Sequence, residues 1–276
     1  MHQTNTKHIR HYHRHLGMSY ATSLSQRLYS LVLVPILLLV LVSWVLEHVG
    51  ARGVAVTSSV SWGFLVAALM LTFVRLLIAY SVALVLAIPL ALLINYNPHV
   101  ERILFPLFDV VQSVPVLAFF PVVILFFVHY NWYNGAAIFI LLITMMWSIV
   151  FSVVGGLQVI PSEIKAAAKV FKFTHLDYID KVLLPAVVPY LVTGSLLAWA
   201  GGWNIIIVAE VLHTYIPGGN AGQDLFGIGS VLVSTAANGQ QHGFFMALIV
   251  LIIFVALMNF FIWQKLLHYA ERFKFE

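Results

Sequence analysis

Long runs without a charged residue enclose one charged, helix-prone segment, and this pattern constrains the fold more than any other feature. Residues 110–162 contain no Asp, Glu, Lys or Arg, and neither do residues 182–209. The segment 161–183 between them holds Glu163 and several lysines. A charged helical segment is costly in hydrocarbon, so we expect it to protrude between two membrane spans. A structured loop of this kind suits contact with a partner protein.

The composition indicates an all-α polytopic membrane protein with about six transmembrane helices. Hydrophobic residues make up 62% of the chain and charged residues 9%, against about 25% charged in soluble domains. A spanning helix needs roughly 20 apolar residues, and the runs lack the strict alternation of a β-barrel. The stretch 60–95 exceeds one crossing, so its first part is expected to lie along the surface or beyond it. The expected spans are 28–48, a helix within 60–95, 104–128, 135–157, 184–209 and 243–265.

The basic residues predict the orientation and the domain limits. With the N-terminus in the cytoplasm, twelve of the 14 Lys and Arg residues fall inside, and only Arg52 falls outside. The positive-inside rule therefore places both termini and the 161–183 segment in the cytoplasm. We expect a basic tail over 1–27, one transmembrane domain over 28–268 and a second tail over 269–276. The chain has no cysteine, which excludes disulfides and thiol catalysis.

The 161–183 segment is expected to fold as two short helices. Ser162 is a candidate N-cap with Glu163 in the first turn. Ile164, Ala167, Ala168 and Phe171 share one helical face, with lysines opposite. Thr174 and Asp177 can cap a second helix in the manner of a capping box, which Pro185 should end. The Ala-rich face could enter a cleft on a partner, or the first helix could lie on anionic lipid with its lysines toward headgroups.

The segment and its flanks resemble the permease subunits of bacterial ATP-binding-cassette importers, in particular the nitrate/sulfonate/taurine branch. That family has a cytoplasmic loop of the form Glu-Ala-Ala, three residues, Gly, and then an Ile/Val-x-Leu-Pro ending. Ala166–Ala168 match its first part and Val182–Pro185 its last. The resemblance covers about residues 60–270. Other matching positions are Pro161, Glu163, Ala186, Pro189, Gly194, Arg75, Pro115–Ala118, Pro121, Trp203, Ala209 and Glu210.

Two positions depart from this pattern. Ala166 stands where the family has Glu, and Lys172 stands where it has Gly. Glycine permits a turn with positive φ that lysine tolerates poorly, so the turn is expected to differ. The departures fit either one half of a heterodimeric pore or a branch with its own ATPase interface.

The resemblance implies a transport subunit rather than an enzyme. No glycine is followed by lysine, so the chain lacks a Walker-type phosphate loop. ATP and Mg²⁺ are therefore expected on a separate ATPase, with no cofactor on this chain. The implied partners are that ATPase, a second permease chain, an extracytoplasmic solute-binding protein and the lipid bilayer of the bacterial inner membrane, with no nucleic acid. The ATPase-coupling residues would be Glu163, Ile164, Ala166, Ala167, Ala168, Phe171 and Lys172, and the solute a small anion such as nitrate, a sulfonate or bicarbonate.

Arg75 and Glu210 are the candidate residues at the outer mouth of the path. Each lies about one bilayer thickness from the cytoplasmic end of its helix. They could pair with each other as an outer gate, Arg75 could contact an anion, or both could reach the membrane interface. Further candidates for the path are Gln112 and Ser113, where prolines could break the third span, and Trp203 and Asn204, which could serve helix packing instead.

Two sequence features have plainer interpretations. The N-terminal histidines His8, His11, His13 and His15 are interleaved with Arg and are expected to form a flexible basic tail rather than a metal site. The glycine-rich stretch 218–229 falls outside the cell in this topology and is expected to form an outer loop or gate. A stand-alone secondary transporter or channel is the alternative function, but such proteins usually carry more charge at mid-membrane. A membrane enzyme would need a catalytic cluster at one depth, and none is evident.

Overall fold

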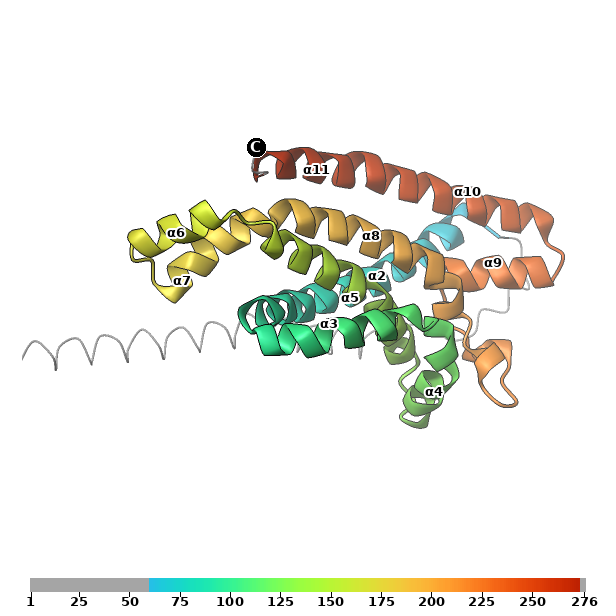
Figure 1. Cartoon of the computed structure of the whole chain (residues 1–276). Helices are drawn as coiled ribbons and strands as arrows, with labels where there is room; N and C mark the ends of the chain where they lie inside the picture. Colours follow the sequence, from blue (N-terminus) through green and yellow to red (C-terminus); the bar gives the residue numbers. More distant parts are fainter. Residues whose placement is uncertain (1–59, 274–276) are drawn as a thin grey trace, which may run out of the picture. The chain divides into compact units, whose positions relative to one another are not determined.

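The computed structural model describes residues 60–273, and every regular element in this part of the chain is helical (Figure 1). The all-α membrane class is therefore confirmed. The predicted span 28–48 and the tail 1–27 lie outside the described residues, so the count of six spans stays a prediction. Four helical stretches are long and apolar enough to cross a membrane, namely Trp62–Tyr96, Tyr133–Gln158, Ile179–Glu210 and Gln241–Phe273, and one bent helix pair is a fifth candidate.

The first described span is a single long helix. α2 (Trp62–Tyr96) begins at the N-cap Ser61, whose side chain accepts a hydrogen bond from the main-chain N–H of Phe64. It continues through Pro89 and ends before Asn97, which precedes a proline and is therefore extended. The 60–95 stretch thus forms one continuous helix, without a break that would let its first part lie along the surface.

The predicted span 104–128 is broken near Pro115, one of the prolines that the sequence offered as a possible break. It comprises parts of α3 (Pro98–Ser113) and α4 (Val116–His129), whose axes are bent by 88°. Val114 is extended because Pro115 follows it, and this residue breaks the helix. Pro121 lies inside α4 and leaves it intact.

α5 (Tyr133–Gln158) is the central helix of the described part and packs against α2 on one side and α8 (Leu184–Glu210) on the other (Figure 1). Small residues allow the close approach. A Cβ on Gly194 would lie 2.9 Å from the main-chain oxygen of Ser148, and one on Gly202 would collide with Met145. Such small-residue contacts are the usual way in which helices associate in membranes. A stripe of fully buried alanines on α2 extends the same packing: Ala79, Ala83, Ala87 and Ala91.

The helix before α8 does not end at Pro185, contrary to the sequence-based expectation. α7 (His175–Tyr178) runs into a π-helical turn, η1 (Ile179–Leu183), and then directly into α8. Pro185 lies in the first turn of α8, next to this wider turn. Proline removes an N–H donor and crowds the preceding turn, and the local π geometry accommodates both effects.

The C-terminal part adds two helices beside this central set. α9 (Ile228–Ala237) contacts α8 and α10 (Gln241–Met258). α10 continues through a π turn, η4 (Asn259–Trp263), α11 (Gln264–Ala270) and a final 3₁₀ turn, η5 (Glu271–Phe273). The predicted span 243–265 lies within this helix. An apolar cluster that includes Leu65, Ile228 and Ala247 joins α2, α9 and α10.

Candidate functional site

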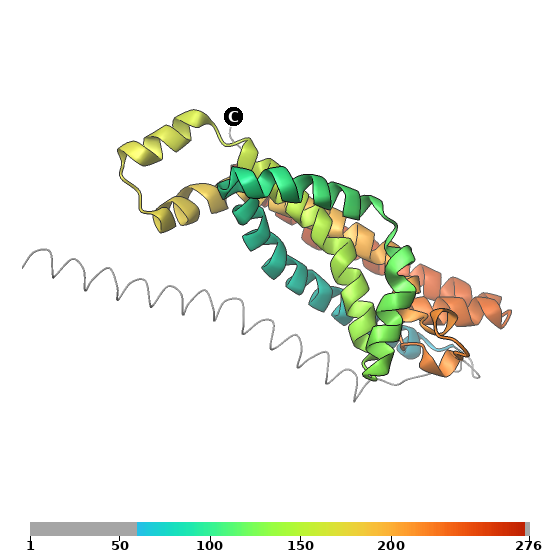
Figure 2. The same ribbon diagram turned by 60° about the horizontal axis from the view of Figure 1, so that its bottom comes forward.

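Residues 161–183 form a helical hairpin that connects α5 to α8. α6 (Ser162–Val170) is its first arm, and α7 with η1 is its second (Figure 2). The hairpin lies beyond the ends of α5 and α8 in the views of both Figure 1 and Figure 2. Two short helices were predicted here, and both are present. Ser162 is the first residue of α6, and its hydroxyl donates a hydrogen bond to the Glu163 carboxylate at 3.2 Å.

The predicted coupling residues divide between two faces of α6. Ala168 is only 6% exposed and lines a cavity of about 260 Å³ with Phe173 and Tyr178 of the hairpin itself. Ile164 lines a second cavity of about 290 Å³, together with Pro185 and residues of η5. The other five predicted coupling residues, Glu163, Ala166, Ala167, Phe171 and Lys172, are exposed.

The single face predicted from helical spacing is therefore wrong, because Ile164 and Ala168 point toward this chain's own residues. Glu163, Ala166, Ala167 and Val170 follow the i, i+3, i+4, i+7 spacing of one exposed face. Phe171 extends this surface and is 73% exposed. We call these five residues the outer face of α6.

Lys172 adopts the left-handed conformation that the family's glycine would permit. Its φ is +51°, in the turn that joins the two arms. The helix–turn–helix is thus formed with lysine at this position. A non-glycine residue in this region costs about 1–2 kcal/mol, and the exposed lysine side chain adds no buried contact to offset that cost.

Thr174 and Asp177 cap the second arm, as predicted. The main-chain N–H of Asp177 donates to Thr174 Oγ1 at 3.2 Å, and the Thr174 hydroxyl donates to the Asp177 carboxylate. Lys181 Nζ lies 2.6 Å from Asp177 Oδ1 one turn later. The hydrogen bonds from Lys181 and then from Thr174 lower the pKa of Asp177, because both favour the carboxylate form.

Arg75 and Glu210 form a buried ion pair between α2 and α8. Arg75 Nη1 lies 2.8 Å from Glu210 Oε1, and the two side chains are 2% and 0% exposed. The snorkelling alternative is excluded by this burial. Contact of Arg75 with a solute is not favoured either, since its Nε donates to Asn134 Oδ1 at 2.7 Å and its Nη1 donates to the carbonyl oxygen of Phe226 at 3.0 Å.

Further polar groups that the sequence did not single out complete this cluster. Thr72 Oγ1 donates to Glu210 Oε1 at 2.7 Å and accepts the main-chain N–H of Ile228 at 2.9 Å. The N–H of Gly229 donates to Glu210 Oε2 at 2.8 Å. Glu210 thus lies at the N-terminus of α9, where the helix dipole favours an anion. The spacing Thr72-x-x-Arg75, which puts both residues on one side of α2, was the available signal for Thr72.

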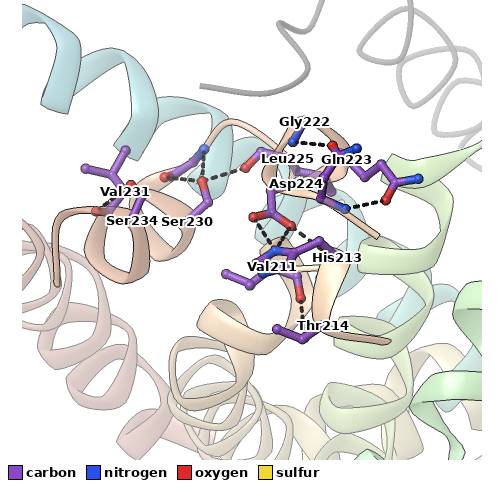
Figure 3. A network of polar contacts seen from close by, with 12 residues as sticks. Val211, His213, Thr214, Gly222, Gln223, Asp224, Leu225, Ser230, Val231 and Ser234 are labelled. Atoms are coloured by element: carbon purple, nitrogen blue, oxygen red, sulfur yellow. Dashed lines mark hydrogen bonds and ion pairs between the residues drawn. The ribbon is translucent and has the colours of Figure 1, made fainter. Parts of the chain in front are cut away.

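Internal polar contacts stabilise the loop between α8 and α9 (Figure 3). The main-chain N–H of His213 donates to Asp224 Oδ1 at 3.0 Å, and the His213 ring nitrogen Nδ1 lies 2.8 Å from Asp224 Oδ2. Ser230 Oγ donates to the carbonyl oxygen of Leu225 at 2.6 Å. The glycine-rich stretch 218–229 is thus an ordered, irregular loop that ends in α9.

The predicted path residues do not all lie together. Gln112 and Ser113 are both exposed at the bend between α3 and α4. Trp203 instead packs against Phe254 of α10, with ring centroids 5.9 Å apart, while its neighbour Asn204 is exposed. The packing interpretation holds for Trp203. The N-terminal histidines lie outside the described residues, and within 60–273 no group of three His, Asp or Glu residues could hold a metal ion.

A family model described as "binding-protein-dependent transport system inner membrane component" matches residues 83–269. A chain of the MetNI methionine ABC transporter, solved in inward-facing conformations, has a similar fold, with a TM-score of 0.60 and 21% sequence identity. That likeness covers 76% of this chain and 97% of the other.

Curated relatives match over a shorter stretch. The nitrate import permease protein NrtB of Leptolyngbya laminosa is 38% identical over 138 residues, which is 50% of this chain and 48% of that protein. The bicarbonate transport system permease protein CmpB of Synechococcus elongatus is 32% identical over 139 residues, 50% of this chain and 49% of its own length. The taurine transport system permease protein TauC of Escherichia coli is 23% identical over 138 residues, with the same coverage of both chains. The matches thus span about half the length of these relatives. Because the family model covers more than half of the sequence, this chain belongs to the family of binding-protein-dependent transport system inner membrane components.

Proposed function

We propose that this chain is the transmembrane permease subunit of an ATP-driven importer in the bacterial inner membrane. The observation that supports this most directly is the exposed helical hairpin of residues 161–183 between two spans, in a chain of this family. A separate ATPase would bind the outer face of α6. Its nucleotide-driven movements would then be transmitted through the second arm, which runs without a break into α8. ATP and Mg²⁺ would be held by that ATPase.

The remaining partners follow from the same proposal. A second permease chain, either a copy of this one or a different one, would complete the path, and an extracytoplasmic binding protein would deliver the solute. The curated relatives are named for nitrate, bicarbonate and taurine, so a small anion is the first solute to test. Measurement of the binding protein's ligand affinity would identify the solute class most directly.

The ATPase contact can be tested with one substitution and a matched control. Ala167→Asp places a carboxylate on the outer face of α6, where it would be buried at the contact without a partner. We expect this variant to insert normally but to lose co-purification with the ATPase and stimulation of ATP hydrolysis. Ala221→Asp makes the same change at an exposed alanine of the α8–α9 loop and should leave both unchanged. Normal co-purification of Ala167→Asp would contradict the proposal and favour the stand-alone transporter or the lipid-surface interpretation of α6.

A further inference from the structure

The last turns of α3 carry a small polar patch. Asp109 Oδ1 accepts a hydrogen bond from Gln112 Nε2 at 2.9 Å, and Ser113 Oγ donates to the main-chain carbonyl of Asp109 at 2.7 Å. All three residues are exposed. Asp109 forms no ion pair with another residue in the described part of the chain, 60–273. We call these three residues the Asp109 patch.

Aromatic contacts place this patch at the middle of a membrane span. Phe105 packs on Phe151 and Phe108 packs on Trp147, with ring centroids 5.2 Å apart in both pairs. α3 therefore runs antiparallel beside α5, and Asp109, next to Phe108, lies at the level of Trp147. Since Trp147 is near the middle of the helix Tyr133–Gln158, Asp109 lies far from either end of that span.

The exposed surface of α3 is divided into two stripes. Ile103, Leu107 and Val110 follow the i, i+4, i+7 spacing of one face and are 69%, 50% and 65% exposed. Arg102, Asp109 and Ser113, spaced i, i+7 and i+11, lie on another face. The first stripe suits contact with lipid. The second does not, because an ionised carboxylate at mid-membrane is strongly disfavoured in hydrocarbon and is usually found facing a water-filled cavity.

We propose that the face of α3 with Asp109, Gln112 and Ser113 lines the aqueous solute path, and that Asp109 makes the wall of this path electronegative at mid-span. The assignment of this path to the solute rests on the proposed import function. The contact of this face with water does not depend on that function. The carboxylate attracts cations and repels anions by ordinary Coulomb interaction. An anionic solute would therefore pass this level without resting there, and selection of the solute would lie elsewhere, as on the external binding protein.

The test uses single cysteines, which are clean reporters because the chain has none of its own. Ser113→Cys reports on the Asp109 patch, and Val110→Cys reports on the apolar stripe one turn away. The assembled transporter in membranes is treated with a cationic and an anionic methanethiosulfonate reagent of similar size. We expect Ser113→Cys to react with both reagents, the cationic one faster by about 3-fold to 10-fold, and Val110→Cys to react with neither.

Addition of Asp109→Asn to Ser113→Cys should bring the two reaction rates close to each other, since the amide keeps the size and the hydrogen bond from Gln112 but loses the charge. An unchanged rate ratio in that double variant would overturn the electronegative wall. An unreactive Ser113→Cys, or one that forms disulfide-linked dimers, would show that lipid or a second copy covers this face and would overturn the proposal as a whole. Labelling does not depend on uptake, so the expected pattern without ATP-dependent uptake would contradict only the import function.

Discussion

At the scale of single residues, the buried pair Arg75–Glu210 is the feature with the largest consequences. Every hydrogen-bonding group described around it has a partner, from Thr72 and Asn134 to the N–H of Gly229. A buried ion pair contributes little net stability against an apolar replacement, but removal of one partner leaves an uncompensated charge. The cluster therefore ties α2, α5, α8 and the start of α9 together.

The pair predicts a strong coupling between two substitutions. Arg75→Ala and Glu210→Ala should each lower the free energy of unfolding by about 3–5 kcal/mol and impair uptake, while the double variant should cost clearly less than the sum. Thermal unfolding of the detergent-purified chain and uptake in vesicles measure the two effects. Lys181→Ala, at the exposed pair with Asp177, is the control and should leave stability nearly unchanged. Wild-type uptake in both single variants would exclude a gate.

Gly227 is required by the packing around Glu210 rather than by its backbone conformation. Its φ is −172°, which any residue adopts, but a Cβ would lie 2.1 Å from Glu210 Oε1. Gly227→Ala should therefore displace the carboxylate and lower the melting temperature. Gly155→Ala is the matched control, because nothing lies within 4 Å of its Cβ position in α5, and it should be neutral or stabilising by about 0.5–1 kcal/mol. Equal melting temperatures for the two variants would contradict this account.

Replacement of Lys172 by glycine is expected to stabilise the turn between the two arms of the hairpin. Because its φ is +51°, Lys172→Gly should relieve about 1–2 kcal/mol of local strain. The measurement is amide hydrogen exchange across residues 161–183, which should slow in the variant. Faster exchange would mean that the lysine side chain stabilises the turn by a contact outside this chain, such as one with the ATPase.

At the scale of elements, the sequence predicted those helices whose limits depend on composition alone. The charge-free runs located α5 and α8 to within a few residues, because span length is set by the bilayer. The run 104–128 was not resolved in the same way. Its prolines indicated a possible break, but neither they nor hydropathy gives the 88° angle between α3 and α4 at the extended Val114. At Pro185 the reverse holds. The proline predicted the end of a helix, but the π turn before it allows the helix to continue into α8.

The hairpin of residues 161–183 shows the same limit at its first arm. Helical spacing grouped Ile164 and Ala168 with the exposed Ala167 and Phe171, because periodicity marks an apolar face without saying what covers it. Phe173 of the turn and Tyr178 of the second arm provide part of that cover. Likewise, the residues that surround Arg75 come from segments far apart in sequence, so only the three-dimensional contacts identified Asn134 and Gly229.

The cap of the second arm predicts a pH dependence. The pKa of Asp177 is lowered in the folded chain, first by the hydrogen bond from Lys181. Such a group contributes stability above its unfolded pKa, and that contribution is lost as the pH falls through the folded value. Amide exchange over residues 174–181 should therefore be slower in the wild type than in Asp177→Asn at pH 7, and this difference should vanish well below the usual Asp range. A difference that persists in acid would exclude the carboxylate as its cause.

At the scale of the whole molecule, much of the apolar surface of residues 60–273 has no partner within that part of the chain. Of the span Gln241–Phe273, only 11% of the most apolar window is buried, against 50% for the central span Tyr133–Gln158. In the proposed function, lipid and a second permease chain would contact this exposed apolar surface. Native mass measurement of the purified transporter would distinguish two copies of this chain from two different permeases, the alternative that Ala166 and Lys172 left open.

The whole proposed function depends on which side of the membrane the hairpin faces. Twelve of the 14 basic residues fall on the side predicted to be cytoplasmic, together with residues 161–183, whereas the loop 211–242 has no Lys or Arg. Single cysteines at Ser162 and Ala221, both exposed, report on the two sides. In intact cells an impermeant thiol reagent should label Ala221→Cys and spare Ser162→Cys, and disruption of the membrane should make both reactive. The reverse pattern would put the hairpin out of reach of any cytoplasmic ATPase and would leave the Arg75–Glu210 cluster at the inner end of the path.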